Sequence, residues 1–306
     1  MVETLVITRN KQTMVTFSKG ILKNVVCLIL VGHTLFACAP AKKLQQYSGT
    51  TQDDPIWVVA HRANTGEGKY PENSLQMIQS CIDHGLQILE LDIRETKDKQ
   101  LVILHDKTVD RTTTGKGLLT DYSLIDLRKL KLTHQGRPTN QLVPTLEEVL
   151  VLAKGKAKLD LDIKLESQDA YERIVNLVKK YKMEKEVLFF LYDIQDIPRV
   201  HQLAPDMDIL ARVHNQHEIK QVQQYPFIQY IHIDEECYDA ETMKALLAKG
   251  YHVWLNSLGT YDALEKAGKN GFDQFLKKYP HVNIIQTDYG LQLIDFLHQK
   301  GKQGSK

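Results

Sequence analysis

Short apolar runs that alternate with amphipathic segments constrain the fold of this chain more than any other feature. Segments with helical spacing of apolar residues separate most of the runs, for example 74–84, 145–153, 169–181, 240–249 and 291–300. Eight strand–helix units within residues 56–300 predict an α/β fold, a (β/α)₈ TIM barrel. The eight predicted strands are residues 56–60, 87–93, 158–163, 187–191, 208–213, 228–233, 251–255 and 283–286.

One connection between predicted strands is longer than a barrel needs. Residues 94–157 separate the second and third predicted strands, whereas a crossover through one helix needs far fewer residues. The segment contains the apolar run LVIL at 101–104, then His105 and the polar turn DRTTTGKG. Functional groups of such barrels lie at the carboxyl ends of the strands and in the loops that follow. We therefore predict an insertion after the second strand that brings His105 to the barrel mouth.

Two segments carry the chemistry, HRANTGEGKYPENS at 61–74 and ELDIRETKDKQLVILHDKTVDRTTTGKG at 90–117. Together they supply two imidazoles, His61 and His105, two carboxylates, Glu90 and Asp92, and the guanidinium of Arg62. Imidazole has an unperturbed pKa of about 6.5, which suits proton transfer near neutral pH. A planar guanidinium donates paired hydrogen bonds to phosphate oxygens. This set of groups is suited to cleaving a phosphodiester.

Glu90 and Asp92 are two residues apart, so on a strand their side chains point to the same face. Leu89, Leu91 and Ile93 would then pack on the other face. One interpretation is a pair of solvated charges on an edge strand. In a barrel, however, these carboxylates would point inward, where they are costly unless paired or bound to metal. Oxygen ligands of this kind favour Ca²⁺ or Mg²⁺.

These residues resemble the glycerophosphodiester phosphodiesterase family in kind, order and spacing. The resemblance covers residues 56–298 and continues more loosely through DIK at 162–164, Trp254 and TDY at 287–289. The motifs that carry it are His61-Arg62, PENS at 71–74, Glu90-x-Asp92, Thr96-x-Asp98, His105-Asp106 and DRTTxGxG at 110–117.

The resemblance implies metal-assisted cleavage in which His61 and His105 act as acid and base, with Asp106 orienting His105 or shaping its turn. A neighbouring glycerol hydroxyl or a water molecule would attack phosphorus. It also implies a third metal carboxylate, Asp162, at a position where the family commonly has Glu. This departure leaves the identity of the metal open.

For substrate binding, the resemblance implies Arg62, Lys164 and Trp254. Lys164 would neutralise the phosphate or a developing alkoxide; the alternative is a surface lysine at a strand end. Trp254 matches an aromatic residue that the family places near the pocket; the alternative is buried packing. Arg111 is expected to hold the insertion in shape, and Ser74 to cap a helix.

The amino terminus predicts export. Lys19 and Lys23 precede an apolar run that ends in LFAC at 35–38, which resembles a bacterial lipoprotein signal. We expect residues 1–37 to be removed, Cys38 to carry the lipid that anchors an exported protein to a membrane, and residues 38–55 to form a polar tether. An ordinary secretory signal or an uncleaved anchor are alternatives. The barrel domain would follow at 56–300.

The net charge argues against nucleic-acid binding, and the cysteine content argues against a disulfide. Four of the 39 basic and one of the 38 acidic residues lie in 1–37, which leaves 35 basic against 37 acidic, or a net charge of −2. The chain therefore offers no basic excess for nucleic acid. Beyond Cys38 only Cys81 and Cys237 remain, and we expect buried thiols rather than a disulfide.

The predicted function is hydrolysis of glycerophosphodiesters, as small-molecule substrates, to glycerol 3-phosphate and an alcohol. Two alternatives remain. One is a phospholipase C- or D-like enzyme that acts on intact lipid. The other is a lipoprotein that binds glycerol phosphates without turnover. The preferred alcohol and the oligomeric state are left open.

Overall fold

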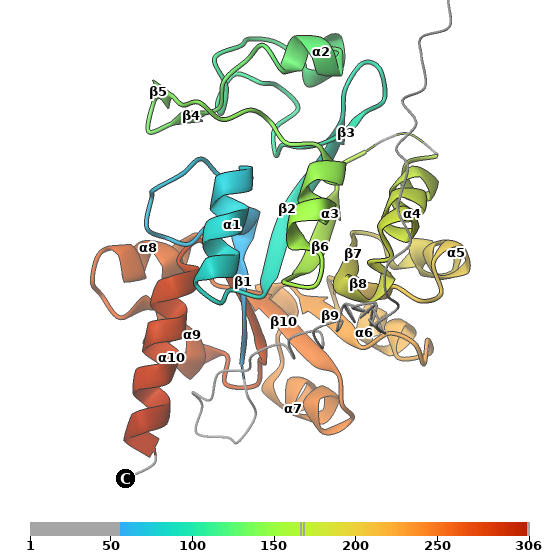
Figure 1. Cartoon of the computed structure of the whole chain (residues 1–306). Coiled ribbons are helices and arrows are strands. Elements are labelled where there is room, and N and C mark those ends of the chain that lie inside the picture. The colour runs from blue at the N-terminus through green and yellow to red at the C-terminus, as the bar shows by residue number, and fades with distance from the viewer. Residues whose placement is uncertain (1–55, 166, 168, 305–306) are drawn as a thin grey trace, which may run out of the picture. The chain divides into compact units, whose positions relative to one another are not determined.

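Eight parallel strands close into a barrel (Figure 1). The computed structural model describes residues 56–165, 167 and 169–304, so the predicted signal and tether lie outside the described residues. β1 pairs with both β2 and β11, which closes the sheet. In order around the barrel the strands are β1 (Trp57–Ala60), β2 (Ile88–Glu95), β6 (Lys158–Ile163), β7 (Val187–Leu191), β8 (Asp208–Val213), β9 (Tyr230–Ile233), β10 (His252–Asn256) and β11 (Ile284–Thr287).

The predicted TIM barrel is confirmed, with a strand at each of the eight expected places. The strand predicted at 87–93 continues to Glu95, because β3 (Leu101–Ile103) pairs antiparallel with its last three residues. This extension depends on a partner strand, which the apolar pattern of β2 alone does not reveal.

Helices surround the barrel (Figure 1). Ser74 caps the first of them as expected, since its side chain accepts a hydrogen bond from the backbone N–H of Met77. Thr145 and Glu148 form a capping box at another. The helices are α1 (Leu75–Asp83), α3 (Leu146–Ala153), α4 (Ala170–Tyr181), α5 (Ile197–Leu203), α6 (Gln216–Val222), α7 (Ala240–Ala248), α8 (Thr260–Lys266), α9 (Gly271–Lys278) and α10 (Gly290–Gly304).

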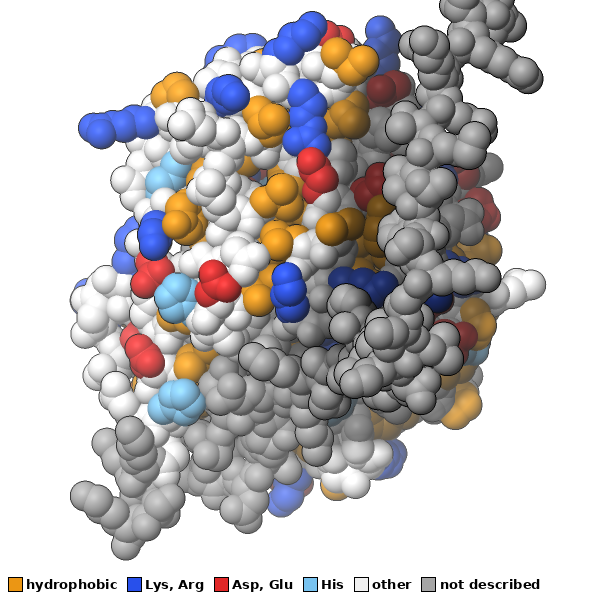
Figure 2. Space-filling view, in the orientation of Figure 1, with side chains coloured by type: hydrophobic (Ala, Val, Ile, Leu, Met, Phe, Trp, Pro, Cys, Tyr) orange, Lys and Arg blue, Asp and Glu red, His pale blue; other side chains and the backbone are white. Residues whose placement is uncertain are grey.

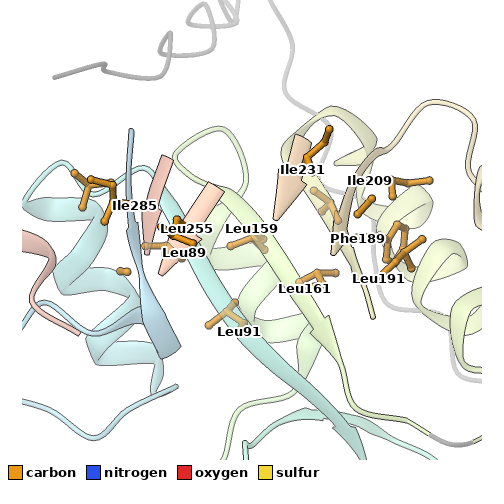
Figure 3. Packing of buried hydrophobic residues seen from close by; sticks show 14 of the residues in the cluster. Leu89, Leu91, Leu159, Leu161, Phe189, Leu191, Ile209, Ile231, Leu255 and Ile285 are labelled. Carbon is orange, nitrogen blue, oxygen red and sulfur yellow. The ribbon is translucent and has the colours of Figure 1, made fainter. Parts of the chain in front are cut away.

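Side chains alternate between two cores. The outer core lies between the sheet and the helices, and Figure 3 shows side chains such as Leu89, Leu91, Leu159 and Leu161 within it. The second core fills the barrel interior, where an apolar layer lies beneath the inward-pointing carboxylates. It consists of Val59, Ile88, Leu188, Phe190, Leu210, Tyr230, Trp254 and Ile284.

The long connection between β2 and β6 lies at the carboxyl end of β2 (Figure 1). It contains β3, α2 (Leu124–Leu127) and a small hairpin of β4 (Thr133–His134) and β5 (Arg137–Pro138). Its last element, α3, packs against α1 and α4. The helix predicted as part of the insertion is therefore one of the outer helices of the barrel. The connection has a core of its own, made of Val102, Leu104, Val109, Leu119, Leu127, Leu132 and Val143.

Cys81 and Cys237 are buried free thiols, so the expectation of no disulfide between them is confirmed. On the face in Figure 2, basic, acidic and hydrophobic side chains are intermixed. Within the described residues, no helix is both long and apolar enough to cross a membrane.

Candidate active site

Four carboxylates meet inside the barrel because β2 and β6 run parallel in a fixed register. Glu90 lies beside Asp160, and Asp92 beside Asp162. All four line a cavity of about 400 Å³. Glu90, Asp92 and Asp160 are at most 3% exposed. Burial, reinforced by the neighbouring negative charges, raises the pKa of Glu90 and of Asp160 well above their ordinary values.

Three of these residues are placed to hold a cation. One oxygen from each of Glu90, Asp92 and Asp162 lies within 4.8 Å of the others. Buried oxygens of Asp162 (Oδ1) and Asn73 (Oδ1) accept no hydrogen bond from a described residue. Asn73 is fixed there, since its amide nitrogen donates to Asp92 Oδ2 at 3.0 Å. Unpartnered oxygens beside mutually repelling carboxylates fit a hard divalent ion.

His61 follows β1 directly and lines the same cavity. Its Nδ1 lies 2.8 Å from Asp288 Oδ1, and its Nε2 lies 3.9 Å from Glu90 Oε2. Asp288 is held in turn by the buried Asp262, which accepts its backbone N–H at 2.8 Å. With Nδ1 bound to a carboxylate, Nε2 is the nitrogen available for proton transfer.

His105 reaches the cavity from the insertion, as predicted. Its Nδ1 lies 2.6 Å from Asp106 Oδ1. Arg111 donates to both Asp106 oxygens and to both oxygens of Glu72, which belongs to the loop after β1. The Arg111 guanidinium and the His105 ring hold the pKa of Asp106 well below its usual value. The expected structural role of Arg111 is thereby explained: it ties the insertion to the barrel.

Arg62 and Lys164 supply the positive charge of the site. The backbone N–H of Arg62, in a left-handed conformation with φ of 49°, donates to Glu90 Oε2 at 2.8 Å. The Arg62 side chain lies against Asp92 and Glu72 rather than on the cavity wall. Lys164 does line the cavity, and its Nζ donates to Asp162 Oδ2 at 2.7 Å. Although burial opposes it, the negative charge of Asp162 raises the pKa of Lys164.

The structure corrects the expected role of Trp254. Its side chain is fully buried in the inner core, and its indole N–H donates to Gln286 Oε1 at 3.1 Å. On β10, Trp254 and Asn256 share the inward face, but Trp254 lies one pleat deeper. Asn256 therefore lines the cavity, and Trp254 packs beneath it.

The sequence pattern missed several residues of the site. Asp288 was part of the TDY match, but its contact with His61 spans 227 positions and leaves no local signal. Arg94 donates through Nε to the backbone oxygen of His105 at 2.7 Å and through Nη1 to that of Lys164 at 3.3 Å. Arg94 thus positions two site residues from different segments. His232, which belongs to none of the family motifs above, also lines the cavity.

The fold and site together define a (β/α)₈ barrel with two carboxylate-bound histidines and a cluster of buried carboxylates at its mouth, a set suited to phosphodiester hydrolysis. The model of the glycerophosphoryl diester phosphodiesterase family matches residues 61–301. The chain belongs to this family.

Individual relatives agree with this assignment. A glycerophosphodiester phosphodiesterase of Caldanaerobacter subterraneus subsp. tengcongensis is 31% identical over 159 residues, which cover 50% of this chain and 64% of that relative. The match thus spans less than two thirds of the relative. Among solved structures, a glycerophosphoryl diester phosphodiesterase of Parabacteroides distasonis has a TM-score of 0.73 at 24% identity, covering 84% of this chain and 93% of that one.

A phosphodiesterase of Oleispira antarctica, solved with the product sn-glycerol-3-phosphate, has a TM-score of 0.58 at 20% identity and covers 78% of this chain and 96% of its own. At these identities, the two structures support the shared barrel fold.

Replacing Asp288 by Ala should lower kcat for a glycerophosphodiester by about 10- to 100-fold, the range seen when a carboxylate that orients a metal-ligating histidine is lost. Asp288→Asn, which keeps an oxygen for His61 Nδ1, should lose less. Steady-state kinetics measures both effects, and thermal unfolding checks that the fold is intact. Unchanged kcat in folded Asp288→Ala would show that the His61–Asp288 contact does not serve the reaction.

Proposed function

We propose that this protein is a metal-dependent glycerophosphodiester phosphodiesterase that releases glycerol 3-phosphate and an alcohol. The observation that carries the proposal is the convergence, on one cavity of about 400 Å³, of two carboxylate-bound imidazoles with a cluster of buried carboxylates. The glycerol 3-phosphate bound to the Oleispira relative supports the same product.

The two histidines act as acid and base. Each has its Nδ1 beside a carboxylate, Asp288 or Asp106, so each presents Nε2 for proton transfer. One imidazole takes the proton from the attacking oxygen, and the other delivers a proton to the leaving alkoxide. The attacking group is the neighbouring glycerol hydroxyl or a water molecule.

The charged groups around the histidines bind and neutralise the phosphate. A divalent cation, Ca²⁺ or Mg²⁺, held by Glu90, Asp92 and Asp162 would polarise a phosphoryl oxygen when bound. Lys164 faces the cavity and offsets charge that develops on the phosphate or the leaving oxygen. Arg62, whose Nε lies 3.6 Å from Asp92 Oδ2, adds positive charge next to the cavity.

The character of the cavity favours a small polar substrate over an intact lipid. Its wall includes charged and polar groups such as His61, Asp92, Lys164, Arg212 and Asn256. Leu118 and Ile125 of the insertion are exposed hydrophobic residues, but neither lines this cavity. A cavity of about 400 Å³ suits a deacylated headgroup.

The experiment that tests the proposal is a panel of glycerophosphodiesters and intact phospholipids, with identification of the bond cleaved at phosphorus. We expect glycerol 3-phosphate from the glycerophosphodiesters, and a loss of about 10²- to 10⁴-fold in kcat in His61→Ala and His105→Ala. Faster cleavage of intact lipids would favour the phospholipase alternative. Binding of glycerol phosphates without turnover would favour the non-catalytic one.

Metal removal gives a second prediction. Because Glu90, Asp92 and Asp162 repel one another without a cation, Ca²⁺ or Mg²⁺ should raise the Tm, and a chelator should abolish activity. At a free ion concentration of about 100 times Kd, the stabilisation is about 2.7 kcal/mol. Calorimetry with and without metal measures the shift.

Two variants of Asp162 separate the effect of its charge from the effect of its side-chain length. Asp162→Ala should lose the metal-induced rise in Tm, whereas Asp162→Glu, with the side chain common in the family, should retain it. Asp206→Ala is the matched control, since this exposed carboxylate lies outside the cavity and pairs only with Lys185 among the described residues. Full activity of chelator-treated wild type would remove the cation from the mechanism.

We further propose that the protein is exported and anchored to a membrane through lipid on Cys38. The support is the sequence LFAC at 35–38 after a short apolar run with two preceding lysines. Residues 1–37 would act as the signal, and 38–55 as the tether.

Mass spectrometry of the mature protein tests the anchor. We expect an acylated Cys38 at the amino terminus, and an unprocessed precursor in Cys38→Ser because lipid attachment needs the thiol. Any other mature amino terminus contradicts the lipoprotein proposal and leaves the enzymatic one intact.

A further inference from the structure

Tyr192 lines the cavity, but the proposed reaction gives it no part. It directly follows β7, and in the parallel register Phe190 of β7 lies beside Asp162 of β6. Side chains two residues apart on a strand share a face, so Tyr192 continues the inward face of Phe190. The same register brings Tyr192 to the level of Lys164. The barrel thus places a phenol hydroxyl next to a proposed metal ligand and a proposed phosphate-binding lysine.

The Tyr192 hydroxyl connects these two charged side chains. It donates to Asp162 Oδ2 at 2.9 Å and accepts from Lys164 Nζ at 3.2 Å. Lys164 Nζ also donates to Asp162 Oδ2 at 2.7 Å. A hydroxyl can donate and accept at the same time, so one group serves both an acid and an ammonium. The three side chains form a closed triangle of hydrogen bonds.

The Tyr192 ring is oriented by contacts of its own. It meets the Phe190 ring edge to face, with centroids 4.8 Å apart and an interplanar angle of 84°. The Arg212 guanidinium lies 5.8 Å from the Tyr192 centroid, in cation–π contact. A tyrosine side chain has only two χ angles, so these contacts restrict the hydroxyl although Tyr192 is 43% exposed. The hydroxyl is therefore preorganised for Asp162.

These contacts make the two oxygens of Asp162 unequal. Oδ2 accepts from both Lys164 and Tyr192, whereas Oδ1 is buried and accepts no hydrogen bond from a described residue. The last torsion of an aspartate side chain is otherwise only loosely restricted, so donors on one oxygen decide where the other points. Oδ1 is thus the oxygen left for a cation shared with Glu90 and Asp92.

We propose that Tyr192 is a positioning residue, whose hydroxyl holds Asp162 so that Oδ1 binds the divalent cation. The inference rests on the proposed function and specifies how its metal site is organised. The hydroxyl has one proton and donates it to Oδ2, so it acts on the cation through Asp162. Without it, Lys164 alone holds Oδ2, and the carboxylate gains freedom that cation binding must remove.

The test uses Tyr192→Phe, which removes the hydroxyl and keeps the ring. We expect the Kd for Ca²⁺ or Mg²⁺ to rise by about 10-fold, near the lower end of the range for losing a group that holds a metal ligand, because Lys164 remains on the same oxygen. Isothermal titration calorimetry of the full chain with each ion measures Kd independently of turnover. Thermal unfolding in chelator checks that the variant is folded.

Tyr225→Phe is the matched control, because Tyr225 packs against Phe227 outside the cavity. Its Kd for either ion should equal that of wild type. The same rise in Kd in Tyr225→Phe would show that loss of a tyrosine hydroxyl weakens binding without any contact to Asp162.

A second background tests whether the hydroxyl acts through Asp162. In Asp162→Glu the carboxylate is one methylene further from the backbone, which removes it from the position at which Tyr192 donates. Adding Tyr192→Phe to Asp162→Glu should therefore raise the Kd by less than it does in wild type, since the two side chains no longer interact. An equal rise in both backgrounds would contradict the proposed route.

Two further results overturn the proposal. One is an unchanged cation Kd in folded Tyr192→Phe while wild type binds the ion, and this result refutes the role of Tyr192 alone. The other is a higher KM for a glycerophosphodiester with an unchanged cation Kd, which would make Tyr192 a substrate contact. Wild type that binds neither ion refutes the metal dependence of the proposed function, and the role of Tyr192 with it.

Discussion

Burial of four carboxylates in one barrel mouth is the constraint on which the rest of the site depends. Parallel register places Glu90 and Asp92 of β2 beside Asp160 and Asp162 of β6, next to the apolar core of the barrel interior. Burial and mutual repulsion raise the pKa of Glu90 and Asp160. The positive charge of Lys164 offsets part of the cost of burying these carboxylates. The negative charge that remains suits a divalent cation.

The surrounding contacts serve to bring distant segments to these carboxylates. A chain of ion pairs through Asp106, Arg111 and Glu72 connects His105 of the insertion to the loop after β1. On the other side of the site, Asp288 after β11 orients His61 after β1. Each imidazole is therefore held by a carboxylate, and neither depends on its own segment alone.

Much of this arrangement was predictable because strands have a period of two residues. Leucines at 89 and 91 against carboxylates at 90 and 92 predict one face toward the helices and one toward the barrel interior, and both faces are found. The predicted helix cap at Ser74, which depends on neighbouring residues alone, is also confirmed. The helix predicted at 145–153 is found as α3, but its packing against α1 and α4 is not encoded in its own sequence.

The sequence by itself determined the eight strands, the inward direction of the carboxylates and the choice of His61 and His105, which both line the cavity. Each depends on residues that are neighbours along the chain. Only the tertiary structure decided that Asp288 meets His61, that Arg94 joins the backbones of His105 and Lys164, and that Trp254 lies below the cavity. These contacts depend on barrel closure and on the depth of each residue along its strand, and both are set by the register between strands far apart in sequence.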